Sequence, residues 1–167
     1  STDITGNYQL LNLETALYRL RFWDYSGAYA FEYYDNALSL EEADDVPVIG
    51  DMVPNINAEL SLAGHVTGTV TMYNGQPPDW AYVHLYHLNG SNWEEVGYDY
   101  LDSGYGYSYD IGGLASGSYR LRASGTYQGA SFWEYYDNAS DLNSATNITV
   151  TAGITTPNIN VVFDDRD

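Results

Sequence analysis

Apolar and polar residues alternate along much of the chain with the period of two that is typical of β-strands. Between Tyr18 and Phe22, the apolar side chains fall on one face, and Arg19 and Arg21 fall on the other. The same alternation predicts strands over residues 46–49, 56–62, 66–72, 82–88, 93–100 and 107–111 and around Tyr119. Turn-forming Gly, Asn, Asp and Pro residues separate these segments at intervals of about 10 residues. The pattern predicts an all-β protein, an antiparallel β-sandwich, with a turn or a short helix of about two turns over residues 37–44.

One stretch of this sequence occurs twice. The matching segments are Tyr18–Arg21 with Tyr119–Arg122, Glu32–Ala37 with Glu134–Ala139, and Pro54–Asn57 with Pro157–Asn160, at separations of 101, 102 and 103 residues. Such a period predicts tandem copies of one small module. The first copy lacks a counterpart of residues 63 to about 101, which is three strands. We therefore expect an incomplete half-module over residues 1–61 and a complete module over residues 62–167.

Several motifs of the second copy follow one another in an order known from a family. They are Gly68-Thr-Val70, Gly75-Gln-Pro77, Ala81-Tyr-Val-His-Leu-Tyr86, Gly106-Tyr-Ser-Tyr109 and Gly112-Gly-Leu-Ala-Ser-Gly-Ser-Tyr-Arg-Leu121. This order resembles the carboxypeptidase-regulatory-like module, an Ig-like, transthyretin-like β-sandwich. The resemblance covers residues 63–163, whereas residues 1–60 match only the later half of the module.

The resemblance implies a protein without catalytic activity of its own. Modules of this type serve as spacers, stalks, adhesive units or folding-support domains, often in tandem on bacterial and archaeal secreted or surface proteins. An extracellular or cell-surface location is therefore expected. The related collagen-adhesin B-type modules often carry a Lys–Asn isopeptide bond, which this chain is unable to form because it has no lysine.

The missing strands have a physical consequence for the first copy. An incomplete sandwich exposes an apolar face and unpaired strand edges, both of which favour association. The residues expected on that face, and so in an assembly interface, are Leu10, Leu13, Leu20, Phe22, Val48 and Ile56. Three hypotheses follow: an excerpt of a longer array, in keeping with a start at Ser1 rather than Met; completion by strands of a neighbouring subunit, giving a head-to-tail homopolymer; or a smaller closed fold.

Charge narrows the range of partners. The net charge is −18, with 23 acidic residues against five arginines, so nucleic acid and anionic membranes are repelled. No apolar run is long enough to insert into a membrane. Cysteine does not occur, which removes disulfide and thiolate chemistry.

The acidic residues cluster in two places, and calcium is the cation that carboxylate oxygens would bind there. The candidate ligands are Asp44, Asp45, Asp51, Asp164 and Asp165. A solvated acidic surface explains the same clusters without an ion, because no EF-hand or similar loop is present. His84 and His87 are three residues apart on a predicted strand, so they point to opposite faces and do not form a transition-metal pair.

Three further features bear on function. Asn89, Asn138 and Asn147 begin Asn-x-Ser/Thr triplets and are candidate glycosylation sites. The 18 tyrosines and four tryptophans supply packing and subunit contacts, or a platform for carbohydrate. No serine lies in a nucleophile elbow, which argues against a hydrolytic triad.

We expect a non-catalytic subunit of an extracellular filament, sheath or surface array, stabilised by strand complementation and by calcium. The alternative is a carbohydrate- or ligand-binding accessory module.

Overall fold

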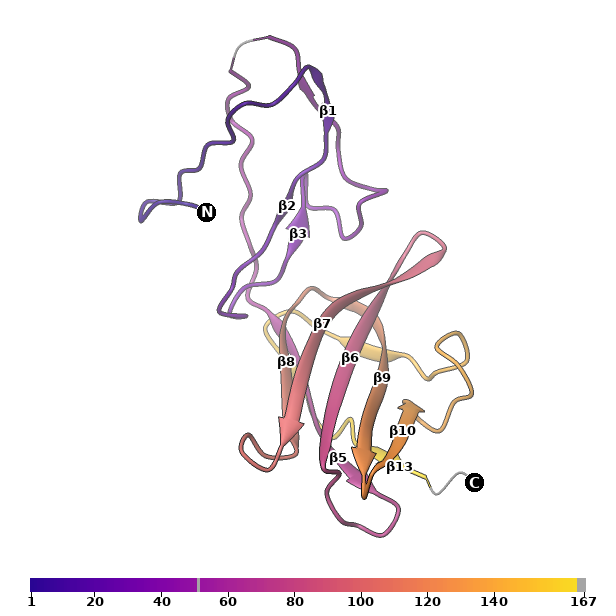
Figure 1. Cartoon of the computed structure of the whole chain (residues 1–167). Coiled ribbons are helices and arrows are strands. Elements are labelled where there is room, and N and C mark those ends of the chain that lie inside the picture. The colour runs from indigo at the N-terminus through magenta and orange to yellow at the C-terminus, as the bar shows by residue number, and fades with distance from the viewer. Residues whose placement is uncertain (51, 165–167) are drawn as a thin grey trace.

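The computed structural model describes residues 1–50 and 52–164, and this part of the chain contains β-strands and no helix (Figure 1). The strands are β1 (Ala16–Tyr18), β2 (Arg21–Phe22), β3 (Glu32–Tyr33), β4 (Val46–Val48), β5 (Gly64–Met72), β6 (Trp80–Asn89), β7 (Asn92–Asp102), β8 (Ser108–Leu114), β9 (Gly117–Tyr127), β10 (Ala130–Tyr135), β11 (Ile148–Val150), β12 (Thr155–Thr156) and β13 (Val161–Phe163). The predicted all-β class is confirmed, with several antiparallel sheets consistent with a β-sandwich.

The larger sheet of the complete module has the order β10-β9-β6-β7, and every pair in it is antiparallel. β11 pairs with the first three residues of β9, so β10 and β11 share the edge of β9 that faces away from β6. Strands β6 and β7 form the longest pairing, with a register shift between Leu85 and Tyr86. The central strands β6 and β9 are thus hydrogen-bonded on both sides.

The second sheet is built around β5, which pairs antiparallel with β8 on one side. On its other side β5 pairs with β12 and then β13, and both run parallel to it. The antiparallel arrangement expected from the sequence therefore holds except at β12 and β13. The Pro157–Asn160 turn separates these two short strands along one edge of β5.

The core lies between the two sheets and follows the alternation seen in the sequence. Its fully buried side chains include Val66, Val70, Met72, Val83, Leu85, Leu101, Leu114, Tyr119, Leu121, Val150 and Phe163. Phe132 of β10 stacks on Phe163 with ring centroids 6.0 Å apart, which joins the two sheets at one end. Burying side chains of this size contributes about 1.5–3 kcal/mol each, so this core is the main source of stability.

The half-module reproduces the local pairing of the complete module. β1 pairs with β4 so that Tyr18 lies opposite Val46, as Tyr119 lies opposite Ile148 in the second copy. β2 pairs with β3 so that Arg21 lies opposite Tyr33, as Arg122 lies opposite Tyr135. The repeated sequence therefore specifies the same register twice.

The two parts of the chain touch through backbone hydrogen bonds at the end of the hairpin that joins β2 and β3 (Figure 1). The N–H of Phe31 donates to the carbonyl of Gly113 in β8, and the N–H of Gly113 donates to the carbonyl of Gly27, both at 3.1 Å. The N–H of Ala63 donates to the carbonyl of Ala28 at 2.9 Å. The half-module is thus attached to the second sheet of the complete module at its β8 strand.

In the half-module, one of two alternatives for residues 37–44 and the strand predicted over residues 56–62 are wrong. Residues 37–44 form turns with a single i to i−4 bond, from the N–H of Ala43 to the carbonyl of Ser39, rather than a helix. The guanidinium of Arg19 takes the carbonyls of Leu40 and Glu41 as acceptors, so these carbonyls serve to hold the loop. Residues 56–62 carry no strand apart from an isolated bridge at Leu62, because this segment has no counterpart of β5 to pair with.

Candidate functional site

The apolar face of the half-module is exposed where the equivalent face of the complete module is buried. Leu10 is 57% exposed and Leu13 is 41% exposed. Their counterparts at a separation of 101 residues are Ile111 and Leu114, which are 3% and 0% exposed. Placing a leucine in water instead of a core forgoes about 1.5–3 kcal/mol. This face therefore has a strong tendency to bind another apolar surface.

The strand segment from Tyr18 to Phe22 continues this face. Tyr18, Leu20 and Phe22 are half-buried, whereas Tyr119, Leu121 and Ala123 at the same positions of β9 are fully buried. Phe22 contacts Tyr8 edge to face, with ring centroids 5.7 Å apart. The two remaining predicted interface residues, Val48 and Ile56, are likewise half-buried.

The half-module also has an open strand edge. In the complete module β9 pairs with β10 and β11 on one side and with β6 on the other. Within the described residues, β1 and β2 pair only with β4 and β3, which correspond to β11 and β10. Their other edge corresponds to the one that β6 occupies. Unpaired edges of this kind are templates for strand addition.

An arginine holds the loop behind this edge in the same way in both copies. Arg19 donates from Nε to Oδ1 of Asp45 at 2.7 Å and from Nη1 to the carbonyls of Leu40 and Glu41. Arg120 donates to Asn147, Leu142 and Asn143 in the equivalent positions. The half-module is therefore preorganised, and a partner would not have to rebuild this loop.

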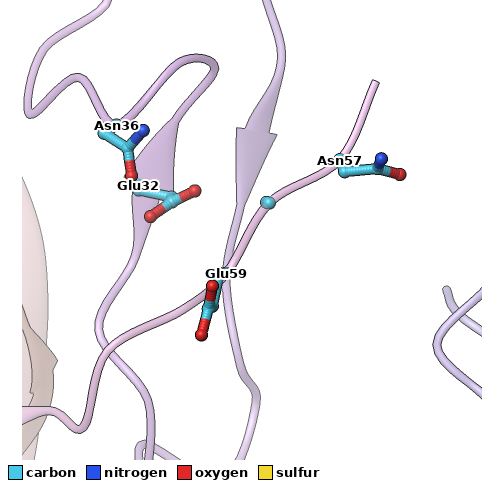
Figure 2. Close-up of a pocket in the computed structure, with 5 residues that line it drawn as sticks. Glu32, Asn36, Asn57 and Glu59 are labelled. Carbon is cyan, nitrogen blue, oxygen red and sulfur yellow. The ribbon is translucent and has the colours of Figure 1, made fainter. Parts of the chain in front are cut away.

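A pocket of about 490 Å³ in the half-module is lined by residues of the β3 hairpin and of the extended segment 57–59 (Figure 2). Figure 2 shows Glu32 and Asn36 on one side and Asn57 and Glu59 on the extended segment that faces them. Burial raises the pKa of Glu32 above its usual value, and the charges of Asp35 and Glu59 add to this effect.

The complete module has a pocket at the equivalent position, lined among others by Glu134, Asn138 and Asn160. There Oδ1 of Asn160 accepts hydrogen bonds from the N–H and the hydroxyl of Thr69 in β5, at 3.0 and 3.1 Å. Asn57, the counterpart of Asn160, therefore lies where a β5-like strand would pass. Sequence analysis missed Asn57, Glu32 and Glu59 as site residues, although the repeated Pro-Asn-Ile-Asn segment contains the signal for Asn57.

The candidate calcium ligands do not gather into one site within the described residues. Asp45 is engaged by Arg19, and Asp44 and Asp164 lie exposed in different parts of the fold. Asp51 and Asp165 fall outside the described residues. Within residues 1–50 and 52–164, no three His, Asp or Glu side chains are grouped to hold one ion.

The histidine pair lies as its spacing predicts, on opposite faces of β6. Nδ1 of His84 is 3.0 Å from Oε2 of Glu95 on the outer face. His87 packs against the buried ring of Tyr119 with ring centroids 5.1 Å apart. Burial lowers the pKa of His87, although the charges of Glu42 and Glu94 oppose this effect.

A tyrosine cluster lies on the outer face of β6 and β7. It consists of Trp80, Tyr82, His84, Tyr98, Tyr100 and Tyr105, with neighbouring ring centroids 4.9–6.3 Å apart. Tyr98 is 63% exposed and Tyr105 is 81% exposed. The planes of Tyr82 and Tyr100 are inclined by 49° and those of Trp80 and Tyr82 by 72°, so the rings do not form one flat platform.

The three candidate glycosylation sites differ in exposure. Asn89 is buried at 7% exposure, at the end of β6. Asn138 and Asn147 are exposed, and Oδ1 of Asn147 accepts a hydrogen bond from Arg120.

No family model, curated protein or solved structure matches the chain. Among the described residues, no helix is long and apolar enough to cross a membrane.

Proposed function

We propose that this chain is a non-catalytic structural subunit of an extracellular filament, sheath or surface array, in which strands of a neighbouring subunit complete the half-module. One observation carries the proposal: the half-module keeps the strand register of the complete module but leaves exposed or half-buried an apolar face whose counterpart is buried there. The resemblance of residues 63–163 to the carboxypeptidase-regulatory-like module supports it, since such modules occur in tandem on secreted and surface proteins. Calcium would add stability to the assembly by bridging acidic side chains of neighbouring subunits, since those of one chain do not gather into one site within the described residues.

Association at this face combines two favourable terms. Apolar side chains such as Leu10 and Leu13 leave water, and the free edge of β1 and β2 gains main-chain hydrogen bonds. The Arg19 loop is already ordered, so little conformational entropy is lost on binding. A contact of this kind joins two different surfaces, and a head-to-tail contact that does not close gives a fibre.

The number of strands limits which segment is donated. Each chain contains the later half of the module twice, over residues 7–60 and 108–163, but contains only one set of the strands β5, β6 and β7. Exchange of these three strands between copies would therefore open one module for each module that it completes. We propose that the donated strand is one that is not already paired inside its own sandwich.

Electron microscopy and light scattering of Leu20→Asp and Leu17→Asp test this function. Leu20 lies on the apolar face, whereas Leu17 is 65% exposed and corresponds to the exposed Ser118 of β9. We expect Leu20→Asp to abolish assembly and Leu17→Asp to leave it unchanged, with the same thermal unfolding of the complete module in both. Assembly by Leu20→Asp to the same extent as by the unchanged chain would disprove strand complementation at this face.

The tyrosine cluster favours a second function, the binding of carbohydrate by an accessory module of a larger secreted protein. Exposed aromatic rings stack on the apolar faces of sugars, and carboxylates such as Glu95 accept hydrogen bonds from their hydroxyls. The inclination of the rings makes this the weaker candidate. Glycan-array binding that is lost in Tyr98→Ala and Tyr105→Ala, with assembly unaffected, would support it.

A further inference from the structure

The way in which the complete module holds β5 indicates which kind of strand the half-module accepts. The turn Pro157–Asn160 contacts β5 at three successive residues. The N–H of Ile159 donates to the carbonyl of Thr67 at 3.0 Å, and Oδ1 of Asn160 accepts from the N–H and hydroxyl of Thr69. Between these residues, a Cβ on Gly68 would lie 2.0 Å from the carbonyl oxygen of Ile159. Only glycine fits at this point.

The half-module contains the same Pro-Asn-Ile-Asn segment, and its first asparagine has the same left-handed φ. Asn55 has a φ of 65° and Asn158, its counterpart, has a φ of 64°. The hydroxyl of Tyr8 donates to the carbonyl of Ile56 at 2.6 Å, as the hydroxyl of Tyr109 donates to the carbonyl of Ile159. The half-module thus already contains the segment that would contact a β5-like strand.

One further position extends this agreement along the segment that precedes β1. Asn12 has a φ of 60°, and its counterpart Gly113 in β8 has a φ of 76°. In the complete module β8 pairs antiparallel with β5, and β13 pairs parallel with it. Residues 7–13 and 58–60 are the counterparts of these two strands, so a strand between them would have neighbours on both sides.

The negative charge of the half-module also restricts which strand it accepts. Residues 1–61 contain 11 of the 23 acidic residues and two arginines, and Glu32 and Glu59 line the pocket next to the turn. β5, GHVTGTVTM, contains no acidic residue and one histidine. A strand that bears carboxylates would be repelled at this position, whereas a neutral or basic strand complements it.

We propose that the half-module is a receptor for a neutral or basic β-strand with an apolar-x-Gly-Thr-apolar sequence. The strand runs parallel to residues 58–60 and antiparallel to residues 7–13, with its glycine over the carbonyl of Ile56 and its threonine on Asn57. This inference rests on the proposed function and adds the direction, register and sequence of the strand that fills the β5 position. In this chain the sequence occurs in β5 and β9, which are both paired, so the accepted strand comes from outside the folded modules.

Binding of synthetic peptides to the full chain tests the inference. The probes are a fluorescent nonapeptide with the sequence of residues 64–72 and the same peptide with Gly68→Val or Thr69→Val. We expect saturable binding of the first peptide by anisotropy, and at least tenfold weaker binding of both altered peptides. Hydrogen exchange should show new protection in residues 7–13 and 54–60 and no loss of protection in β8 and β13.

A substitution at Asn57 of the half-module tests the other side of the same contact. Asn57 is exposed, so Asn57→Leu leaves the fold intact, and we expect it to weaken binding of the first peptide at least tenfold. Asn36→Gly removes an exposed amide in the same pocket that has no counterpart of the Thr69 contact, and glycine adopts the φ of 60° found there, so this variant should have no effect.

Four results would overturn the inference: no binding of the first peptide at millimolar concentration, equal binding of the Gly68→Val peptide, unchanged binding by Asn57→Leu, or loss of protection in β8 and β13. The last result would mean that the peptide displaces β5 from the complete module. Assembly that is blocked by Leu20→Asp but unaffected by Asn57→Leu would retain the proposed function while rejecting this register.

Discussion

Tyr18 and Tyr119 are the same residue of the repeat in two different surroundings. The hydroxyl of Tyr119 is buried and donates to the carbonyl of Ala115 at 2.8 Å, and burial raises the pKa of Tyr119 well above its usual range. The hydroxyl of Tyr18 makes the same bond, to the carbonyl of Glu14 at 3.0 Å, but in contact with water. The cost of losing this bond should therefore differ between the copies.

We expect Tyr119→Phe to lower the free energy of unfolding of the complete module by about 1–3 kcal/mol, because a buried carbonyl loses its donor. Tyr18→Phe should cost less than about 0.5 kcal/mol, since water replaces the hydroxyl. Urea unfolding followed by tryptophan fluorescence measures both values. Equal costs in the two variants would mean that the half-module is buried in solution in the same way as the complete module.

His87 makes the stability of the complete module depend on pH. Its pKa in the folded chain is lowered from 6.5 by burial, so protonation favours the unfolded state. The stability that the buried, neutral His87 contributes is fully present above the pKa of histidine in the unfolded chain, about 6.5. It is lost as the pH falls through the lower pKa of His87 in the folded chain. We expect the melting temperature to fall between pH 7.5 and pH 5 and to fall less in His87→Gln. His84→Gln removes a histidine from the opposite face and should not reduce the fall.

At the scale of single residues, the sequence predicted faces better than contacts. The spacing of His84 and His87 on a strand placed them on opposite faces, which is confirmed. The partner of Asn160 was beyond reach, because Thr69 lies 91 positions away and no local pattern links the two residues. Side-chain contacts across a sandwich depend on how the sheets are paired, which alternation alone does not specify.

At the scale of elements, the predicted strands formed where both partners lie in the chain, whereas the short strands β10 to β13 were not predicted. Alternation located β5 to β9, whose pairings are all internal. Residues 56–62 alternate equally well but do not form a strand, because the strand with which they would pair has no counterpart in residues 1–61. The helix predicted over residues 37–44 failed because two turns are too short to be stable without a packing partner.

Because β9 is paired on both sides and its counterparts β1 and β2 on one side only, their backbone amides should be protected unequally from hydrogen exchange. Amides of β9 lie between β6 and β10 and should exchange only on global unfolding. Amides of β1 and β2 lie at an open edge and should exchange orders of magnitude faster in the dispersed chain. Hydrogen exchange with mass spectrometry measures both. In the assembled state, we expect β1 and β2 to become protected, and protection that does not change on assembly would contradict complementation.

At the scale of the whole molecule, the repeat was the informative signal. Matching anchors about one module apart indicated the two copies before any geometry was known. The same sequence did not indicate how the copies touch, since Gly27 and Gly113 meet through backbone atoms that leave no trace in residue type. Whole-molecule charge, in contrast, is known from the sequence and makes its own prediction.

A net charge of −18 opposes association of like subunits over long distances. Raising the salt concentration from 0.01 to 0.15 M shortens the Debye length from about 30 Å to about 8 Å and removes much of this repulsion. We therefore expect assembly to be faster and more extensive in 0.15 M sodium chloride, as measured by light scattering and sedimentation. Calcium chloride at equal ionic strength separates screening from ion binding: an equal effect assigns assembly to screening, whereas a larger effect assigns it to the acidic clusters. Assembly that weakens with added salt would show that ion pairs, rather than apolar burial and strand pairing, hold the subunits together.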